Sequence, residues 1–285
     1  MKVPAVAPEH LPPQGERKPL VTLALLTYNQ RKFVSDAVNG ALSQTYHPLE
    51  ILISDDASQD GTFGVIESIV SAYAGPHRIV LNQNVENLGV IRHLSQVNDR
   101  ASGEIIVVAA GDDVSIPERV ESLTRRFVAH PDCVYAHSGA RNLNAQGEVG
   151  KHTSSPGLDC FHSPLRAARA NCLALGATAA WRKTVLDEFP AISPKVWAED
   201  LVMGFRALLL GRVEYVPEPL VWYRHDSGIT ARKVSKCQAH LRDFHVRRQR
   251  LRDALAKRRI LLCVVTGIFT ALSATKFALA RVRKL

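Results

Sequence analysis

Short apolar runs alternate with segments of helical period from residue 20 to about residue 130, and this alternation restricts the possible folds more than any other feature. The runs with the length of buried strands are Leu20–Leu26, Leu49–Ile53, Ile79–Leu81 and Ile105–Ala110. Apolar residues three and four positions apart predict helices over Phe33–Leu42, Phe63–Tyr73, Val90–Arg100 and a segment that starts around Pro117 and ends near Ala129. The pattern predicts an α/β fold in which helices flank a mainly parallel, doubly wound sheet.

The composition is that of a folded globular protein. Of the 285 residues, 46% are hydrophobic and 22% are charged, which excludes a disordered, collagenous or multi-span membrane chain. The five Cys show no CxxC spacing, so neither a disulfide framework nor a zinc cluster is expected, and a reducing compartment is favoured. Residues 1–18 are rich in Pro and charge, and we interpret them as a flexible leader rather than a signal peptide.

Positive charge is concentrated at the C-terminal end. Residues 231–285 carry 15 Lys and Arg against 2 Asp and Glu, a net of +13, whereas the whole chain has a formal net charge of +9. The first 230 residues therefore have a net charge of −4. The sequence thus divides into a leader over 1–18, a main domain over 19–230 and a basic helical tail over 231–285.

The tail contains an apolar segment, residues 260–280, in which Lys276 is the only charged residue. Its length is close to the roughly 20 residues that span a bilayer. Three interpretations remain open: a single anchor, an in-plane amphipathic helix, or a helix packed on this chain or on another. Basic clusters on both sides favour an anionic membrane surface as the partner. Phe244 is the only aromatic residue between Arg232 and Arg259, so no nucleic-acid partner is expected.

Polar and acidic residues follow three of the predicted strands. In open parallel sheets, ligands bind beyond the carboxyl ends of the strands. We therefore expect these side chains to converge on one edge of the sheet. They are Tyr28 and Asn29 after the first strand, Asp55 and Asp56 after the second, and Asp112 and Asp113 after the fourth.

The two acidic pairs allow a structural as well as a functional interpretation. Asp residues after a strand form Asx turns and helix caps without any further role. Adjacent carboxylates repel each other, however, and need donors or a cation to lie close together. Asp55 or Asp56 can accept a hydrogen bond from a pyrimidine ring N–H or a ribose hydroxyl. Asp112 and Asp113 supply the hard oxygen ligands that suit Mg²⁺ or Mn²⁺ bound to a diphosphate.

Three stretches together resemble glycosyltransferase family 2, whose members have the GT-A fold. The resemblance covers roughly residues 20–230, in the family's order. It implies a GT-A sheet and a transferase that uses a nucleotide-diphosphate sugar. The stretches are TYNQRKFVSDAVNGALSQTYHPLEILISDDASQDGT at residues 27–62, ASGEIIVVAAGDDVSIPERV at 101–120, and WAEDLVMGFRALLLGRVEYVPEPLVWYRHDSGIT at 197–230.

The resemblance also implies roles for individual residues. Asp200, in the Glu199–Asp200 pair, would be the general base, and the N-terminus of the predicted helix Leu201–Leu210 favours the ionised form that a base requires. Without the family context, the pair would be interpreted as ordinary acidic residues at the N-terminus of a helix. The donor nucleotide would contact Tyr28, Asn29, Asp55, Asp56 and Asp112. Asp112 and Asp113 would hold Mn²⁺ or Mg²⁺. A weaker candidate for the metal is His225, in the Tyr223-Arg224-His225 segment that would lie beside the diphosphate.

The sequence departs from the family pattern at two places. Many members have Asp where this chain has Ala110, two residues before Asp112, which leaves the exact metal ligand open. The QxxRW motif of processive polymerising members is absent, which favours transfer of one sugar per event.

The expected function is an inverting, metal-dependent transfer of one sugar from a UDP- or dTDP-sugar to a hydroxyl of a glycan, lipid-linked or protein acceptor. We expect it to serve surface polysaccharide or glycan assembly in the cytoplasm, at the inner face of the cell membrane, with homo-oligomerisation left open. One rival is a catalytically silent GT-A module bound to the membrane, which Ala110 supports. A nucleotidyltransferase would be expected to carry a Gly-rich basic loop near the first strand, and a dinucleotide-dependent oxidoreductase would be expected to carry GxGxxG there. The residues at that place, Thr27-Tyr28-Asn29-Gln30, match neither pattern.

Overall fold

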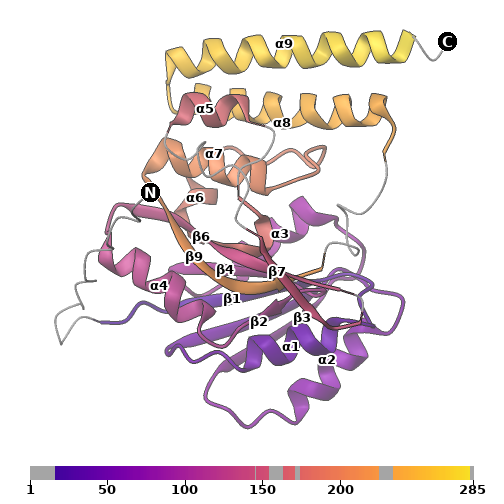
Figure 1. Ribbon diagram of the computed structural model, residues 1–285, viewed down its shortest axis with the longest axis vertical. Coiled ribbons are helices and arrows are strands. Elements are labelled where there is room, and N and C mark those ends of the chain that lie inside the picture. The colour runs from indigo at the N-terminus through magenta and orange to yellow at the C-terminus, as the bar shows by residue number, and fades with distance from the viewer. Residues whose placement is uncertain (1–16, 145, 154–162, 171–173, 225–233, 283–285) are drawn as a thin grey trace.

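The computed structural model describes residues 17–282 except 145, 154–162, 171–173 and 225–233 (Figure 1). The strands are β1 (Val21–Thr27), β2 (Leu49–Asp55), β3 (Arg78–Gln83), β4 (Ile105–Ala110), β5 (Val114–Ser115), β6 (Cys133–Leu143), β7 (Val149–Thr153), β8 (Ala179–Arg182) and β9 (Arg212–Tyr223). The helices are α1 (Val34–Leu42), α2 (Thr62–Ser71), α3 (Val90–Arg100), α4 (Arg119–Ala129), α5 (Pro164–Arg169), the 3-10 turn η2 (Gly176–Thr178), α6 (Thr184–Asp187), α7 (Asp200–Leu210), α8 (Lys236–Ala256) and α9 (Ile260–Val282).

Within the described residues these strands form one mixed sheet in the order β3-β2-β1-β4-β8-β6-β9-β5, with β7 paired to β6. The first four strands in this order pair in parallel, as the sequence predicts. Beyond β4 the sheet continues through antiparallel pairs of β8 with β4 and with β6, a parallel pair of β6 with β9, and an antiparallel pair of β9 with β5. The result is a Rossmann-like α/β sheet with an antiparallel extension.

The parallel strands are buried on both faces because helices cover both sides of the sheet (Figure 1). Along β1, Val21, Leu23 and Leu25 pack with α1, α2 and α4, while Ala24 packs on the opposite face with α3, α5, α7 and α8. The period of two along each strand thus divides its residues between two cores. Strands buried in this way read as continuous apolar runs in the sequence.

The sequence-based boundaries agree with the structure where apolar residues define them. The predicted strand Ile105–Ala110 and helix Val90–Arg100 coincide with β4 and α3. The first turn of α4 is an exception, because the helix begins at Arg119 and Pro117 lies in the turn before it. The carbonyl of Pro117 accepts a hydrogen bond from the Thr45 amide at 3.0 Å, which fixes this turn against the end of α1.

Helices α8 and α9 form a hairpin stacked on α5 and α7, and α9 lies along the outer edge of the molecule (Figure 1). Val246 and Ala254 of α8 and Leu262 of α9 are buried in the same core as α7. The basic C-terminal segment therefore contributes to the core that supports the main sheet.

Several sequence-based expectations concern residues outside the described part of the chain. These are most of the leader, His225, the boundary near residue 230, and two of the five cysteines, Cys160 and Cys172. The three described cysteines, Cys133, Cys237 and Cys263, are free.

Candidate active site

The strands β1, β2 and β4 end at the same level of the sheet. Thr27 is in register with Asp55, and Leu26 is in register with Ala110. The amide of Asp56 donates to the Thr27 carbonyl at 2.9 Å, and the amide of Gly111 donates to the Leu26 carbonyl at 2.9 Å. The segments that follow the three strands therefore lie side by side at one edge of the sheet.

Asp55 organises the loops that follow β1 and β2. Its fully buried carboxylate accepts hydrogen bonds from the Thr27 hydroxyl at 2.9 Å and from the Ser58 amide and hydroxyl at 2.8 and 2.6 Å. Asn29, with a φ of 52°, joins the same loops, because its amide donates to the Ser58 hydroxyl at 2.8 Å and its side-chain oxygen accepts from the Gln59 amide at 2.8 Å. Beside them the Tyr28 side chain is 43% exposed and able to contact a ligand.

Asp56 holds the loop that follows β3. Its carboxylate accepts from the Asn84 side-chain amide at 2.8 Å and from the Leu88 and Gly89 amides at 2.9 Å each. The Asp55–Asp56 pair is thus stabilised by protein donors, which removes the need for a cation that two adjacent carboxylates would otherwise have. Both residues remain at the predicted donor edge, and both also have a clear structural role.

Arg224, at the end of β9, fixes the second acidic pair. Its amide donates to Asp113 Oδ1 at 2.8 Å and its Nε donates to the Asp112 carbonyl at 2.9 Å. The guanidinium also pairs with Asp36 at 2.8 Å and lies 4.6 Å from the centre of the Phe33 ring. Arg224, which lies 112 positions after Asp112 in the sequence, therefore fixes the backbone conformation of the Asp112–Asp113 pair.

The Asp112–Asp113 pair has the chemistry of a cation site. Burial, followed by repulsion from Asp112, raises the pKa of Asp113 well above its ordinary value. Asp113 Oδ2 is buried and has no hydrogen-bond partner among the described residues. A nearby cation would relieve both penalties, so the pair fits a divalent metal. Since no group of three or more His, Cys, Asp or Glu side chains gathers as a metal site in the described part of the chain, a bound metal would need further ligands from substrate or water.

Gly111 allows β4 to approach β1 closely just before the acidic pair. A Cβ atom at this position would lie 2.4 Å from Gln30 Oε1 and 2.7 Å from Thr27 Cγ2, well inside contact distance. Glycine is therefore required for packing between the two strand ends.

Arg119 connects the acidic strand end to η2. Its buried guanidinium donates to the carbonyls of Val108 and Ala177 at 2.6 and 2.7 Å and to the Ser115 hydroxyl at 2.8 Å. Its charge lowers the pKa of Asp113, in opposition to burial. We did not single out Arg119 from the sequence, although a cation in the first turn of a helix is disfavoured by the helix dipole and so signals a specific partner.

The turn η2 also contacts the Glu199–Asp200 pair. A Cβ atom on Gly176 would lie 2.7 Å from Glu199 Oε1 and 3.4 Å from Asp200 Cβ. Arg119 and Gly176 thus link the end of β4 to the start of α7 through one short turn. This chain of contacts connects segments that are far apart in the sequence.

Asp200 is the first residue of α7, and its Oδ1 accepts a hydrogen bond from the Leu201 amide at 2.7 Å. Burial raises the pKa of Asp200 to about 6, against the opposing effects of the Leu201 and Gly176 amides and the Arg250 charge. Burial and the Asp200 charge raise the pKa of Glu199 to about 7. The expectation that the helix N-terminus would favour the ionised form is thus outweighed by burial. A carboxylate with a raised pKa is a stronger proton acceptor than an exposed one.

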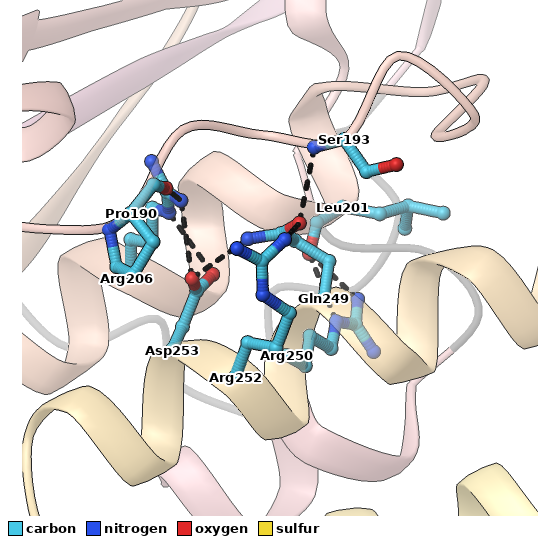
Figure 2. Close-up of polar contacts among 8 residues, drawn as sticks. All are labelled: Pro190, Ser193, Leu201, Arg206, Gln249, Arg250, Arg252 and Asp253. Atoms are coloured by element: carbon cyan, nitrogen blue, oxygen red, sulfur yellow. Dashed lines mark hydrogen bonds and ion pairs between the residues drawn. The ribbon is translucent and has the colours of Figure 1, made fainter.

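Helix α8 holds the helix that carries Asp200 (Figure 2). The buried Arg250 guanidinium donates to the Leu201 carbonyl at 3.0 and 2.8 Å and to the Ala167 and Ala170 carbonyls at 2.9 and 2.7 Å. Next to it, Arg206 of α7 and Asp253 of α8 form a fully buried ion pair, with nitrogen–oxygen distances of 3.0 and 3.1 Å. The composition of residues 231–285 predicts only a basic tail, and it does not reveal this role of Arg250 and Asp253.

The buried ion pair provides a test of this attachment. Asp253→Ala leaves the Arg206 guanidinium buried without its counter-charge, and we expect the free energy of unfolding to fall by about 3–5 kcal/mol. Denaturant titration of both proteins measures the change. The matched control is Glu188→Ala, which removes the more exposed partner of Lys257 and should cost at most about 1 kcal/mol. Equal losses for the two variants would contradict the assigned role of the pair.

A small apolar pocket lies close to these segments. It has a volume of about 190 Å³ and is lined by residues of Leu88–Arg92 and of Pro194–Trp197. The first segment begins with the two amides that bind Asp56, and the second lies just before Glu199. His225, the remaining predicted metal residue, lies outside the described residues.

Comparison with known proteins identifies the family of the chain. The family described as Glycosyl transferase family 2 matches residues 22–184, more than half of the chain. The chain therefore belongs to glycosyltransferase family 2.

Curated relatives match over much of the chain. An uncharacterised protein of Mycobacterium tuberculosis is 27% identical over 216 residues, which cover 73% of this chain and 60% of the relative. The chain thus spans about 60% of the length of that relative. TuaG of Bacillus subtilis, named for teichuronic acid biosynthesis, is 25% identical over 157 residues, 55% of this chain and 61% of TuaG.

Solved structures share the GT-A fold. Residues 1–349 of Staphylococcus aureus TarS in complex with UDP-GlcNAc superpose with a TM-score of 0.61 at 19% identity, covering 82% of this chain and 66% of TarS. The mannosyltransferase PcManGT of Pyrobaculum calidifontis, in complex with GDP-Man and Mn²⁺, also gives 0.61 at 17% identity, covering 97% and 79%. The predicted GT-A fold is therefore confirmed.

Proposed function

We propose that the chain transfers one sugar from a nucleotide-diphosphate donor, UDP- or dTDP-linked, to an acceptor hydroxyl with inversion of the anomeric centre. The main supporting observation is the link through η2, which joins the acidic end of β4 to the half-buried Glu199–Asp200 pair. A donor-binding edge next to a carboxylate that can act as the base is the arrangement that a one-step displacement needs.

In the proposed reaction, Asp200 accepts the proton of the acceptor hydroxyl while the hydroxyl oxygen attacks the anomeric carbon. The bond from that carbon to the diphosphate oxygen breaks, and the nucleoside diphosphate leaves with the bonding electrons. One displacement by one nucleophile inverts the anomeric centre. Tyr28 and Asn29 would contact the donor base, and Asp55 and Asp56 would position the base or ribose through the loops they hold.

Asp112 and Asp113 would hold the divalent metal. Bound Mn²⁺ or Mg²⁺ would supply positive charge that neutralises the departing diphosphate. The Mn²⁺ complex of PcManGT supports divalent metal use by this fold. Arg224 engages Asp113 Oδ1, so Asp113 would hold the metal through Oδ2, together with the Asp112 carboxylate, with the contribution of His225 as a further proposal. Ala110 has no side-chain oxygen for a ribose hydroxyl, so side-chain contacts to the donor would rest on the remaining residues.

We also propose that the reaction serves the assembly of a surface polysaccharide or related glycan. The acceptor would be a glycan, a lipid-linked molecule or a protein. The similarity to TuaG supports the class of pathway. The proposed location is the cytoplasm, at the inner face of the cell membrane, and the free cysteines of the described residues accord with a reducing compartment.

A panel of nucleotides and nucleotide sugars tests the donor class. Calorimetric titration with UDP, dTDP, GDP and their sugar conjugates in the presence of Mn²⁺ should give tightest binding to a UDP or dTDP compound. A preference for GDP compounds would contradict the proposed base. Absence of binding to every diphosphate would contradict the proposed function itself.

The raised pKa of Asp200 gives the expected pH dependence. The base acts only when ionised, so kcat/KM should fall as the pH decreases through about 6, the pKa to which burial raises this carboxyl. Below that value the loss should approach about tenfold per pH unit. An ordinary exposed Asp would lose activity only near pH 4, about its unperturbed pKa. Initial rates from acidic to neutral pH measure the position of the acid limb.

Arg250 supplies the discriminating variants. Its charge lowers the pKa of Asp200, so Arg250→Gln should move the acid limb to higher pH, whereas Arg250→Lys keeps the charge and should move it less. Thermal unfolding of both variants controls for lost stability. An acid limb that stays in place in Arg250→Gln would assign the ionisation to another group.

A further inference from the structure

We propose that α9 is a monotopic membrane helix, which lies in the plane of an anionic bilayer with one face among the lipids and the other face packed on α8. The inference goes beyond the proposed function and does not depend on it. Ile260–Ala280 is long and apolar enough to cross a membrane, with a mean hydropathy of 1.8. Length and composition therefore permit a span, and the packing of the two faces decides between a span and an in-plane helix.

The outer face of α9 is an exposed apolar stripe. Its large side chains are between 49% and 80% exposed, and only 17% of the span candidate is buried in the chain. A spacing of about four residues places them on one side of the helix. The stripe consists of Ile260, Leu261, Val264, Ile268, Leu272 and Leu279.

The inner face of α9 has different chemistry. Thr266 and Ser273 are buried, and the Ser273 hydroxyl donates to the Asp243 carboxylate of α8. The Phe269 ring contacts the guanidinium groups of Arg169 and Arg247, at 5.7 and 5.2 Å from its centre. These contacts could not survive if lipid surrounded α9 on all sides.

Helix α8 cannot follow α9 into a bilayer without loss of the core. Arg250 and Asp253 attach α8 to α7, which carries Asp200. A spanning α9 would therefore have to separate from α8. A helix with one packed face and one apolar face, by contrast, satisfies both sets of contacts at a membrane surface.

Charge identifies an anionic lipid surface as the occupant of the stripe. Arg258 and Arg259 are exposed just before α9, and Lys276 is exposed near its other end. The sequence adds Arg281 at the end of α9, and Arg283 and Lys284 after it. The two acidic residues of the basic tail, residues 231–285, both pair with arginines: Asp243 pairs with Arg247, and Asp253 pairs with Arg206. A second copy would bring two strongly basic segments together, which like-charge repulsion opposes.

Flotation of the full-length protein with lipid vesicles tests the proposal. The protein should float with phosphatidylcholine vesicles that contain about 30% phosphatidylglycerol, and should float much less with phosphatidylcholine alone. Ile268→Asn combined with Leu272→Asn should reduce partitioning at least about tenfold, because both side chains lose their apolar contact. The matched control, Val85→Asn with Val149→Asn, changes exposed apolar residues outside α9 and should bind like wild type. Point variants are preferable to truncation, since removal of the tail would also remove α8 from the core.

The basic residues and the orientation are tested separately. Arg258→Gln with Arg259→Gln should lower partitioning about 25-fold, roughly fivefold for each charge near the surface, and high salt should release the wild-type protein. Tryptophan placed singly at Ile260, Ile268 and Leu279 should be quenched by shallow lipid probes to a similar extent at all three positions. A spanning helix would instead give the deepest quenching at residue 268.

Three results would overturn the proposal. One is failure of the wild-type protein to float with anionic vesicles. Another is a depth gradient along α9, which would show a span. The third is a dimer in solution that the Ile268→Asn, Leu272→Asn variant converts to a monomer while vesicle binding is absent, which would assign the stripe to a second copy.

Discussion

Replacement of Asp200 by Asn is expected to lower kcat by about 10²–10⁴-fold, the usual loss when general-base catalysis is removed. The substitution keeps the shape of the side chain and removes its capacity to accept a proton. Donor and metal binding should be retained, because Asp55, Asp56 and Asp112 are unchanged. Turnover at saturating donor and the donor Kd from calorimetry are to be measured on the same preparations.

The neighbouring carboxyl provides the matched control. Glu199→Gln alters the same pair but leaves the proposed base. The pKa of Glu199, about 7, lies above that of Asp200, about 6, so Glu199 is protonated where Asp200 ionises, and this variant should keep most of the turnover and leave the acid limb close to its wild-type position. If Asp200→Asn turns over like wild type, the base lies elsewhere. If donor affinity falls in parallel with turnover, Asp200 is a donor-site or structural residue.

Removal of the divalent metal is expected to have a comparably large effect. Excess chelator should abolish transfer, and Mn²⁺ or Mg²⁺ should restore it. Asp112→Asn should reduce kcat/KM by on the order of 10²–10³-fold, as for other groups that stabilise charge developing in a transition state. The nucleotide affinity of this variant should also lose most of its dependence on Mn²⁺, which calorimetry can measure without turnover.

Asp113→Asn and Asp99→Asn complete the metal experiment. Asp113→Asn removes a buried charge that Asp112 repels and keeps an oxygen that can accept from the Arg224 amide, so it should weaken the Mn²⁺ dependence of nucleotide affinity without unfolding the chain. Asp99 is an exposed residue of α3, and its variant should match wild type. Full activity of the wild-type protein in excess chelator would exclude the metal from the reaction.

The parallel half of the fold could be predicted because its strands are apolar on both faces. Ile105–Ala110 has no polar residue, so its boundaries follow from composition alone. The later strands lack this signal. β6 contains the buried polar residues His137 and Ser138, and β9 contains Pro217 and Pro219, which sequence rules associate with strand ends or edges. Their place in the sheet depends on pairing across long sequence separations.

The candidate site could be predicted in part for a related reason. Strand ends and the family resemblance predict Asp55, Asp112 and Asp200 as site residues, and the structure places the first two after strands that flank β1. The groups that set their environment come from elsewhere in the chain. The amides that hold Asp56 belong to residues 88 and 89, and Arg224 is 111 positions from Asp113. The raised pKa of Asp200 depends on tertiary burial, which a helix start in the sequence does not reveal.

The most direct test of the proposed reaction follows the products by time-resolved ¹H and ³¹P NMR, with the preferred nucleotide sugar, Mn²⁺ and an acceptor hydroxyl. The account predicts that nucleoside diphosphate appears together with a sugar linkage whose anomeric configuration is opposite to that of the donor, and that Asp200→Asn suppresses both signals. Retention of the donor configuration would contradict single displacement by an acceptor that Asp200 activates. Appearance of sugar 1-phosphate in place of nucleoside diphosphate would contradict glycosyl transfer and indicate a nucleotidyltransferase.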